Sequence, residues 1–268
     1  MTQVVTRRHN KIITDNPRIV SMVPSLTELL YDLDLLANIV GCTKFCVHPQ
    51  KLLKDIPKFG GTKCVDSSVI LDLKPTHIIM NIDENKKELF EQFKNNNVEV
   101  IITHPQTPLD NLILFETFGK IFSRMELANT LSTKFKQSLL NLRKDSKLHT
   151  PKDVLYLIWR KPWMSVARDT YISKMLKLIN YNTVDSLSKE RYPAISEAEL
   201  LSIGCDAILL SSEPYPFKER HIAEIKTLCK SCDEVSLIDG EKISWYGSRA
   251  IKGLEYLRAI ASKESVYV

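Results

Sequence analysis

The sequence predicts an α/β protein with two lobes of similar build, and three observations support this prediction. Buried strands alternate with amphipathic helices in both halves of the chain. A long helical tract without strand-like alternation separates the halves, and each half contains a short helix that leads directly into a strand. Alternating strands and helices are typical of a parallel sheet with helices on both faces. We therefore expect an N-terminal extension (1–17), a first lobe (18–108), a connecting tract (109–147) and a second lobe (148–268).

The first half begins with an apolar strand and an amphipathic helix. Ser25 and Glu28 have the spacing of a capping box, with Pro24 just outside the helix, and leucines recur on one side of it. The strands predicted in this half are 18–23, 39–42, 77–82 and 98–103. The further helices predicted here are 67–73, which Pro75 ends, and 84–95.

The central tract has apolar residues at helical spacing and no proline between residues 109 and 144. The spacing is carried by Leu112, Phe115, Phe118, Phe122, Leu131, Phe135, Leu139 and Leu142. Gly119 is a candidate kink or break. A tract of this length predicts a stiff connector between two lobes, and the alternative is a pair of ordinary helices in one domain.

The second half repeats the pattern of the first. The strands predicted here are 154–159, 207–211 and 234–238. The helices are 171–179, 218–229, 248–261 and a short one that starts near Ser196, where Glu199 completes a second capping box. In both 71–80 and 200–210 a short helix leads into a strand, which a helix and another strand follow. We interpret this as an internal duplication.

The composition is typical of a globular protein that binds neither nucleic acid nor membranes. The 268 residues are 44% hydrophobic and 26% charged, and the basic residues behind the net charge of +5 are spread along the chain. No apolar stretch has the length of a membrane span, and residues 1–16 do not resemble a secretory signal. We therefore expect a cytoplasmic monomer whose six cysteines are free thiols. Cys229 and Cys232 form a CxxC pair, but no second pair completes a zinc motif.

Large aromatic residues gather where predicted strands end. Each of the three tryptophans follows a strand, and so do several other aromatic residues; the set comprises Phe45, Trp159, Trp163, Tyr215, Phe217, Trp245 and Tyr246. In open α/β sheets, ligands bind at the carboxyl ends of the strands. An aromatic ring stacked on a flat partner contributes about 1 kcal/mol beyond area burial. We predict an aromatic cleft between the lobes that holds a flat ligand; the alternative is that these rings seal the interface between the lobes.

Arg160, Arg168 and Arg249 accompany the aromatic residues. Arginine grips carboxylate or amide groups and stacks on rings, so these three are candidate ligand contacts, and ordinary surface ion pairs are the alternative. Arg249 also lies at a predicted helix start, where backbone amides favour an anion.

Cys46 and His48 lie two residues apart in one loop. Each is a candidate axial ligand to a metal already held inside a cofactor. Two ligands do not make a metal site built by the protein, and a loop histidine packed on Pro49 is the alternative. Motifs of common enzymes, such as GxSxG, a phosphate-binding loop or HExxH, are absent, so we expect no catalysis.

Seven segments carry a resemblance to a known family. They are RIVSMVPSLTELL (18–30), VGCTKFCVHP (40–49), FGGTK (59–63), LKPTHII (73–79), IWRKPWM (158–164), SSEPYPF (211–217) and DGEKISWYGSR (239–249). Together they resemble the class III substrate-binding proteins of ABC importers for cobalamin, haem and iron-siderophores, and above all the branch called helical backbone metal receptors. The resemblance covers about residues 18–257. It implies two Rossmann-like lobes with parallel-rich sheets, joined by a single long backbone helix.

The resemblance also implies a ligand and contacts to it. In the cobalamin binders of this family, aromatic side chains from both lobes hold the corrin ring. The matching positions here are Phe45, Phe59, Trp163, Tyr192, Trp245 and Tyr246. The implied ligand is cobalamin or another corrinoid, haem or an iron-siderophore, and the fold itself would require no cofactor.

Two departures from the family affect the expected partners. Members that serve a permease carry a docking glutamate on each lobe, and the matching positions here are Ser68 and Ala198, the latter between Glu197 and Glu199. Together with the lack of a secretory signal in residues 1–16, the lack of both glutamates favours a non-enzymatic cytoplasmic carrier, store or sensor. The alternatives are a periplasmic importer subunit for cobalamin or iron-siderophores, and an enzyme that acts on such a cofactor through Cys46 or His48.

Overall fold

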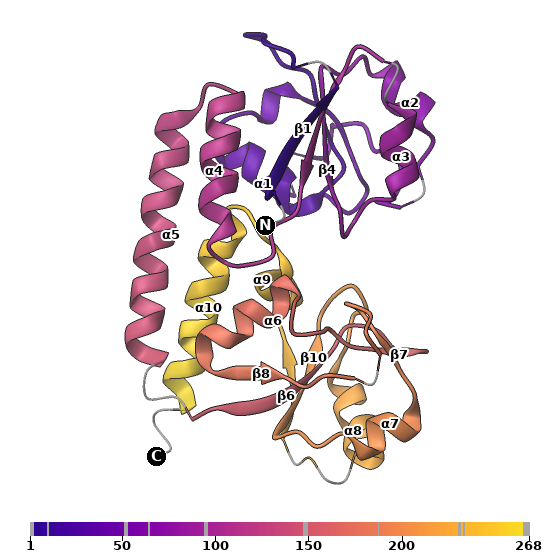
Figure 1. The fold of residues 1–268 in the computed structure, drawn as a ribbon, viewed down its shortest axis with the longest axis vertical. Helices are drawn as coiled ribbons and strands as arrows, with labels where there is room; N and C mark the ends of the chain where they lie inside the picture. Colours follow the sequence, from indigo (N-terminus) through magenta and orange to yellow (C-terminus); the bar gives the residue numbers. More distant parts are fainter. Residues whose placement is uncertain are drawn as a thin grey trace. The chain divides into compact units, whose positions relative to one another are not determined.

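The computed structural model describes residues 3–9, 11–50, 53–63, 65–93, 96–146, 150–186, 188–229, 232 and 234–264. The chain forms two compact units (Figure 1). Unit 1 contains residues 1–105, 109–134 and 246–249, and unit 2 contains residues 106–108, 135–245 and 250–268. Four residues near the C-terminus, 246–249, thus belong to the unit formed mainly by the first half of the chain.

Unit 1 is built on a five-stranded sheet in the order β1-β5-β4-β2-β3. The strands are β1 (Val5–His9), β2 (Ile19–Ser21), β3 (Ile39–Cys42), β4 (His77–Asn81) and β5 (Glu99–Thr103). The pairs among β2 to β5 are parallel, and β1 is antiparallel to β5. The four strands predicted from the sequence are confirmed; 39–42 has the predicted bounds, and the ends of the other three differ by at most two residues.

Helices cover both faces of this sheet, as Figure 1 shows. One face carries α2 (Ser67–Asp72) and α3 (Lys87–Gln92), and the other carries α1 (Pro24–Asp32) and α4 (Asp110–Ile121). An apolar cluster joins the strands to α2 and α3; it includes Val20, Met22, Ile70, Ile78, Met80, Leu89, Phe93 and Val100. Because both faces are covered, β4 is buried along its whole length, which explains its continuous apolar pattern.

Helix α1 begins differently from the prediction. Val23 is its N-cap without a side-chain cap bond, and Pro24 occupies the first turn, where its missing N–H costs nothing. The predicted capping box of Ser25 and Glu28 is therefore wrong. The Glu28 carboxylate instead binds Arg249.

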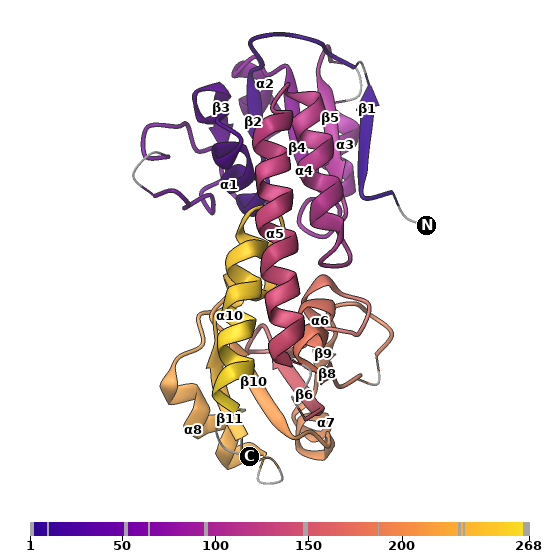
Figure 2. The same cartoon turned by 90° about the vertical axis from the view of Figure 1, so that its left-hand side faces the viewer.

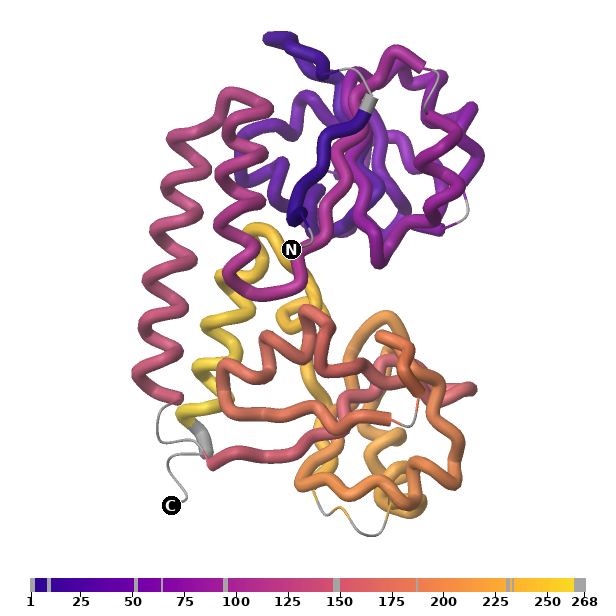
Figure 3. The backbone as a smooth tube through the Cα atoms, viewed as in Figure 1, coloured from indigo at the N-terminus to yellow at the C-terminus, as the bar shows by residue number. Residues whose placement is uncertain are grey.

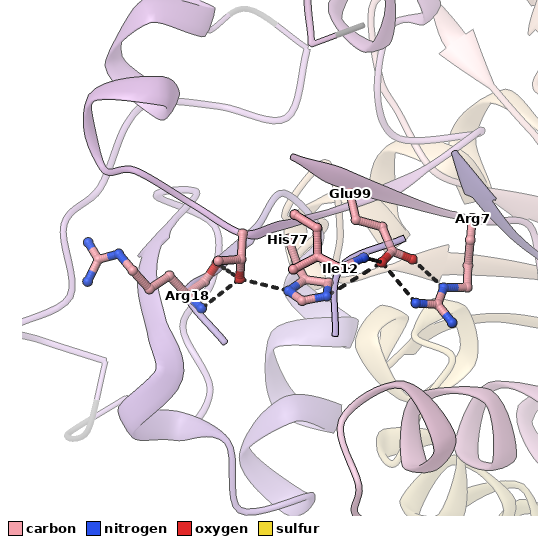
Figure 4. Close-up of polar contacts among 6 residues, drawn as sticks. Arg7, Ile12, Arg18, His77 and Glu99 are labelled. Atoms are coloured by element: carbon pink, nitrogen blue, oxygen red, sulfur yellow. Dashed lines mark hydrogen bonds and ion pairs between the residues drawn. The ribbon is translucent and has the colours of Figure 1, made fainter. Parts of the chain in front are cut away.

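The predicted N-terminal extension contains a strand that the sequence analysis missed. Figure 3 shows the indigo segment of β1 running along β5, and Val5 pairs with Thr103 at one end of the register. Glu99 anchors this strand from the amino end of β5 (Figure 4). Its fully buried carboxylate accepts bonds from the Arg7 guanidinium and, at 2.7 Å, from the Ile12 N–H. His77 Nε2 lies 3.7 Å from the same carboxylate.

The central tract forms two helices, α4 and α5 (Met125–Asp145). The chain turns between them at Ser123, which has φ of 55°, so the break lies beyond Gly119. A Cβ at Gly119 would lie 2.6 Å from the Cβ of Ala128. Gly119 therefore permits close packing of α5 on α4, and the prediction that it marks the break is wrong.

Unit 2 repeats the strand connectivity of unit 1. Its parallel sheet has the order β11-β10-β6-β8, where β6 is Lys152–Leu157, β8 Tyr181–Thr183, β10 Ala207–Ser211 and β11 Glu234–Ile238. When the parallel strands of each unit are numbered from one to four along the chain, both sheets have the spatial order 4-3-1-2. The shared order confirms the internal duplication. The sequence analysis missed β8 and the small ribbon of β7 (Trp163–Met164) and β9 (Ala194–Ile195).

Helices also cover both faces of the second sheet (Figure 1). One face carries α7 (Glu197–Ser202) and α8 (Glu219–Leu228), and the other carries α6 (Tyr171–Leu176), α9 (Gly240–Ser244) and α10 (Arg249–Glu264). Ser196 Oγ accepts from the Glu199 N–H at 3.1 Å, which confirms its predicted role as the N-cap. Figure 2 shows α10 beside α5, where Arg258 pairs with Asp145.

Candidate functional site

The carboxyl ends of the strands are the expected ligand-binding edge of each unit. Strand order reverses between β2 and β4 in unit 1 and between β6 and β10 in unit 2. Such a switch point separates the loops on its two sides and leaves a crevice outside the strand ends. The loops that follow β3, β6 and β10 carry most of the aromatic residues singled out from the sequence.

In unit 1, the loop after β3 presents Phe45 to solvent. The ring is 50% exposed, and Lys44 Nζ lies 5.2 Å from its centroid. The loop is tied to the segment 57–60, because the Lys44 N–H donates to the Gly60 carbonyl at 2.8 Å and the Phe59 N–H donates to the Cys42 carbonyl at 3.3 Å. Phe59 itself packs partly buried against the apolar cluster of unit 1. Phe45 is thus the ring of this loop that is free to contact a ligand.

Cys46 and His48 lie in different surroundings. Cys46 is 2% exposed, and its Sγ contacts the hydroxyls of Thr27 at 3.1 Å and Thr43 at 3.2 Å. Burial raises the pKa of this thiol well above its usual value, so it stays protonated and is a poor metal ligand. His48 is partly exposed. Within the described residues, no group of three or more His, Cys, Asp and Glu side chains is arranged to hold a metal ion.

Two predicted ligand contacts near the C-terminus are buried inside unit 1. The Tyr246 hydroxyl donates to Glu84 Oε1 at 2.6 Å, and the Arg249 guanidinium makes two bonds to Glu28, with Nε 2.5 Å from Oε2. Both carboxylates come from the first half of the chain. Glu28 already neutralises Arg249 in a buried site, which favours the ion-pair alternative over contact with an anionic ligand group.

In unit 2, four predicted contacts come together in one aromatic cluster. Trp159 is 38% exposed and meets Tyr215 edge to face, with centroids 5.7 Å apart. Tyr215 in turn meets Phe217 at 4.8 Å, and Phe217 stacks on Trp163 at 6.3 Å. Trp163 is only 5% exposed and belongs to the apolar core of the unit. Trp159 is therefore the exposed ring, and Trp163 supports it from the core.

The arginines beside this cluster already have partners. Arg160 forms a bidentate ion pair with Glu224 and lies 5.8 Å from the Trp163 ring centroid. Arg168 donates to the Thr183 carbonyl at 3.0 Å and pairs with Asp185 at 3.2 Å. Both side chains are arranged as structural ion pairs, the alternative that the sequence left open. Tyr192 is partly exposed, with the Arg191 guanidinium 5.9 Å from its ring.

Glu213, which the sequence analysis did not single out, organises the loop after β10. Its Oε1 accepts bonds from Ser244 Oγ at 2.6 Å and from Trp245 Nε1 at 2.7 Å. Trp245 is consequently buried and fixed. Burial raises the pKa of the Glu213 carboxyl, and the nearby Glu241 and Asp239 add to the shift. Glu213 lies in the SSEPYPF segment, in which the sequence analysis considered only the aromatic residues as ligand contacts.

A pH dependence follows from Glu213. Because its pKa is higher in the folded chain than in the unfolded chain, its favourable contribution to stability is present at acidic pH and is lost as the pH rises through the folded pKa. We expect Glu213→Gln to gain stability relative to the wild type as the pH rises above the usual glutamate value of 4.5. Urea unfolding of both proteins across this range measures the difference in the free energy of unfolding, in which the other titrating groups cancel. If Glu213→Gln instead lost stability relative to the wild type as the pH rises, the assignment would be contradicted.

The two positions matched to docking glutamates are exposed and equivalent. Ser68 is the second residue of α2, and Ala198 is the second residue of α7. Asp66 caps α2 by accepting from the Ser68 N–H at 2.9 Å, while Glu197 and Glu199 supply the acidic groups of the first turn of α7. Both short helices therefore present acidic side chains near the matched positions.

Comparisons with known proteins agree with this fold. A family model described as periplasmic binding protein matches residues 19–228. The vitamin B12-binding protein of Photorhabdus laumondii is 22% identical over 194 residues, which are 72% of this chain and 70% of that protein. The crystal structure of the periplasmic vitamin B12 binding protein of Vibrio cholerae superposes with a TM-score of 0.79 at 20% identity, over 92% of this chain and 98% of that chain. The periplasmic heme-binding protein of Roseiflexus sp. RS-1 gives 0.79 at 17% identity, with the same coverage of both chains.

The comparisons do not support the cytoplasmic location expected from the sequence, because the family that the chain matches is described as periplasmic binding protein. Among the described residues, no helix combines the length and apolar character that crossing a bilayer would need.

Proposed function

Because the chain belongs to the periplasmic binding protein family, we propose that it binds a metal-containing small molecule and releases it chemically unchanged. The proposed ligand class is a corrinoid such as cobalamin, haem or an iron-siderophore, since relatives are named for vitamin B12 and heme binding. The observation that carries the proposal is the presence of an exposed aromatic ring at the carboxyl edge of each duplicated sheet, Phe45 in unit 1 and Trp159 in unit 2.

These two rings have different supports, and both supports make them rigid platforms. Phe45 lies in a loop held by backbone bonds to the segment 57–60, and Trp159 rests on Tyr215. Flat, preorganised rings lose little conformational entropy when a planar ligand stacks on them. We propose Phe59, Tyr192 and Tyr215 as further, partly exposed contacts, and His48 as the side chain that reaches the metal of the bound ligand.

Trp163, Trp245 and Tyr246 act indirectly in this proposal. Each is less than a tenth exposed and contacts its own unit, through Phe217, Glu213 and Glu84 respectively. They position loops and do not line the ligand. Of the aromatic contacts implied by the family resemblance, Phe45 is thus the fully available ring, and Trp159 replaces Trp163 as the exposed tryptophan.

Removing either exposed ring is expected to weaken binding by about fivefold to tenfold, because each stacked ring contributes about 1–1.4 kcal/mol, and removing both should weaken it further. Visible-band titration of the wild type, Phe45→Ala, Trp159→Ala and the double variant with cobalamin, hemin and a ferric siderophore measures this. Leu140→Ala is the matched control, because Leu140 is an equally exposed apolar residue on α5. Equal affinities in all variants, or no saturable binding at micromolar concentrations, would refute the proposal.

A more specific form of this function is service to an ABC permease outside the cytoplasmic membrane. It is favoured by the periplasmic relatives and by the acidic first turn of α7. Fractionation of the native host tests it, since recovery in the cytosol alone would exclude it. Recovery of the ligand with an unchanged absorption spectrum after long incubation separates carriage from enzymatic turnover.

A further inference from the structure

A buried histidine lies behind the aromatic cluster of unit 2. His221 belongs to the first turn of α8 and is 4% exposed. Its ring meets those of Tyr215 and Phe217 edge to face, with centroids 5.5 and 5.4 Å apart. Because Tyr215 in turn contacts the exposed ring of Trp159, His221 forms the layer that supports this ring from inside the unit.

The backbone of α8 requires a neutral His221 ring. The N–H of Lys218, the N-cap residue, donates to His221 Nδ1 at 2.8 Å, so this nitrogen carries a lone pair. The proton of the neutral ring then lies on Nε2, which is 3.3 Å from the Tyr215 hydroxyl oxygen. His221 thus caps α8 with one nitrogen and holds Tyr215 with the other, since a side chain that accepts from the N-cap N–H is half of a capping box.

A proton on Nδ1 is incompatible with this arrangement. The ring would then carry an N–H group at both nitrogens, and the one at Nδ1 would face the Lys218 N–H, donor against donor. The His221 ring has to turn or move away, and Tyr215 loses the ring and the nitrogen that hold it. The backbone of Trp159 is held separately by its bridge to Met164, so the change affects the Trp159 ring and not the end of its strand.

The surroundings of His221 mostly oppose such a proton. Burial lowers the pKa of His221 below its ordinary value of 6.5, and the charges of Arg220 and Arg160 lower it further. Arg220 Nε lies 3.4 Å from Nε2, whereas Glu224, also on α8, acts in the opposite direction and raises the pKa. The neutral ring is therefore the form present at neutral pH. Its contribution to stability is complete above pH 6.5 and is lost as the pH falls through the lower folded pKa.

We propose that His221 is the positioning residue of the Trp159 ring, and that it holds this ring through Tyr215 only while Nδ1 is unprotonated. Acidification then frees the Trp159 ring and lowers the affinity of the protein for a planar ligand; this consequence for binding rests on the function proposed above. The fall in affinity should not exceed the effect of Trp159→Ala, about fivefold to tenfold, because the ring is still present and loses only its preorganisation.

Two measurements on the full-length protein without ligand test the positioning itself. NMR of the histidine ring C–H groups, from neutral pH down to the pH at which circular dichroism shows loss of the fold, follows the titration of His221; its signal is the one missing from His221→Gln. Acrylamide quenching of tryptophan fluorescence, taken as the difference between the wild type and Trp159→Phe, follows the exposure of the Trp159 ring. We expect this quenching to rise below pH 6.5, with the midpoint of the His221 titration.

Two variants separate the charge on His221 from its role as a cap. Glutamine at this helix position accepts from the N-cap N–H in an ordinary capping box, so His221→Gln should keep the Trp159 ring in place at every pH. His221→Leu has no acceptor and should show the quenching of the acid form already at neutral pH. Visible-band titration with cyanocobalamin and hemin should give an affinity that falls with the His221 titration in the wild type, and no such fall in His221→Gln.

The outcomes distinguish the positioning role from the proposed function. Quenching that stays constant while His221 titrates, a His221 that does not titrate before the fold is lost, or the same pH-dependent quenching in His221→Gln would overturn the positioning role. If quenching follows His221 but neither probe binds at any pH, the positioning role stands and the proposed function fails. Should His221→Gln not fold, the His221 signal is assigned through its contacts with the Tyr215 ring, and agreement of the two midpoints in the wild type decides.

Discussion

Replacing Arg249 with methionine is expected to lower the free energy of unfolding by about 3–5 kcal/mol, because the change leaves the Glu28 carboxylate buried without its partner. Both side chains of this pair are less than a tenth exposed, and the bond is bidentate. The loss should appear as a lower urea midpoint with an unchanged slope.

Two further variants show whether the unpaired charge is the cause. Removing both charges in Glu28→Leu/Arg249→Met should recover most of the stability, because no buried charge remains unpaired. Arg258→Met breaks an ion pair that is nearly half exposed at the arginine, and it should cost less than about 1 kcal/mol. If Arg249→Met were no more destabilising than Arg258→Met, the buried pair would not be holding residues 246–249 in unit 1.

Replacing Glu99 with glutamine is expected to cost about 2–3 kcal/mol and to loosen β1 from the sheet. Breaking a fully buried pair costs about 3–5 kcal/mol, and the lower figure allows for Arg7, which is 28% exposed. A glutamine oxygen can still accept from the Ile12 N–H, but the amide cannot bind the Arg7 guanidinium with two oxygens.

Hydrogen exchange localises this effect. The amides of β1 should exchange faster in Glu99→Gln, while those of β10 in unit 2 should keep their protection. Glu88→Gln on α3 is the matched control, because Glu88 is an exposed residue in the first turn of a surface helix. Unchanged exchange in β1 would show that the backbone ladder alone attaches the strand.

The sequence by itself determined the elements whose pattern is local. The segments 39–42, 207–211 and 234–238 became strands with those bounds. Of these, β10 is buried along its whole length, as a strand covered on both faces should be. Ser196 capped α7 as predicted because a cap depends on residues only three apart. The duplication was visible for the same reason, and the strand orders of the two sheets confirmed it.

Only the tertiary structure decided which side chains are free and which are occupied. Trp159 and Trp163 lie four residues apart in equally aromatic surroundings, yet stacking on Phe217 buries one and leaves the other exposed. Arg249 and Glu28 are 221 residues apart, and Lys58 reaches Cys42 across 16 residues. The strand β1 has no apolar alternation of its own and exists through its ladder with β5 and the Glu99 anchor. Burial and pairing depend on residues that the fold brings from far along the chain, so periodicity and short motifs do not encode them.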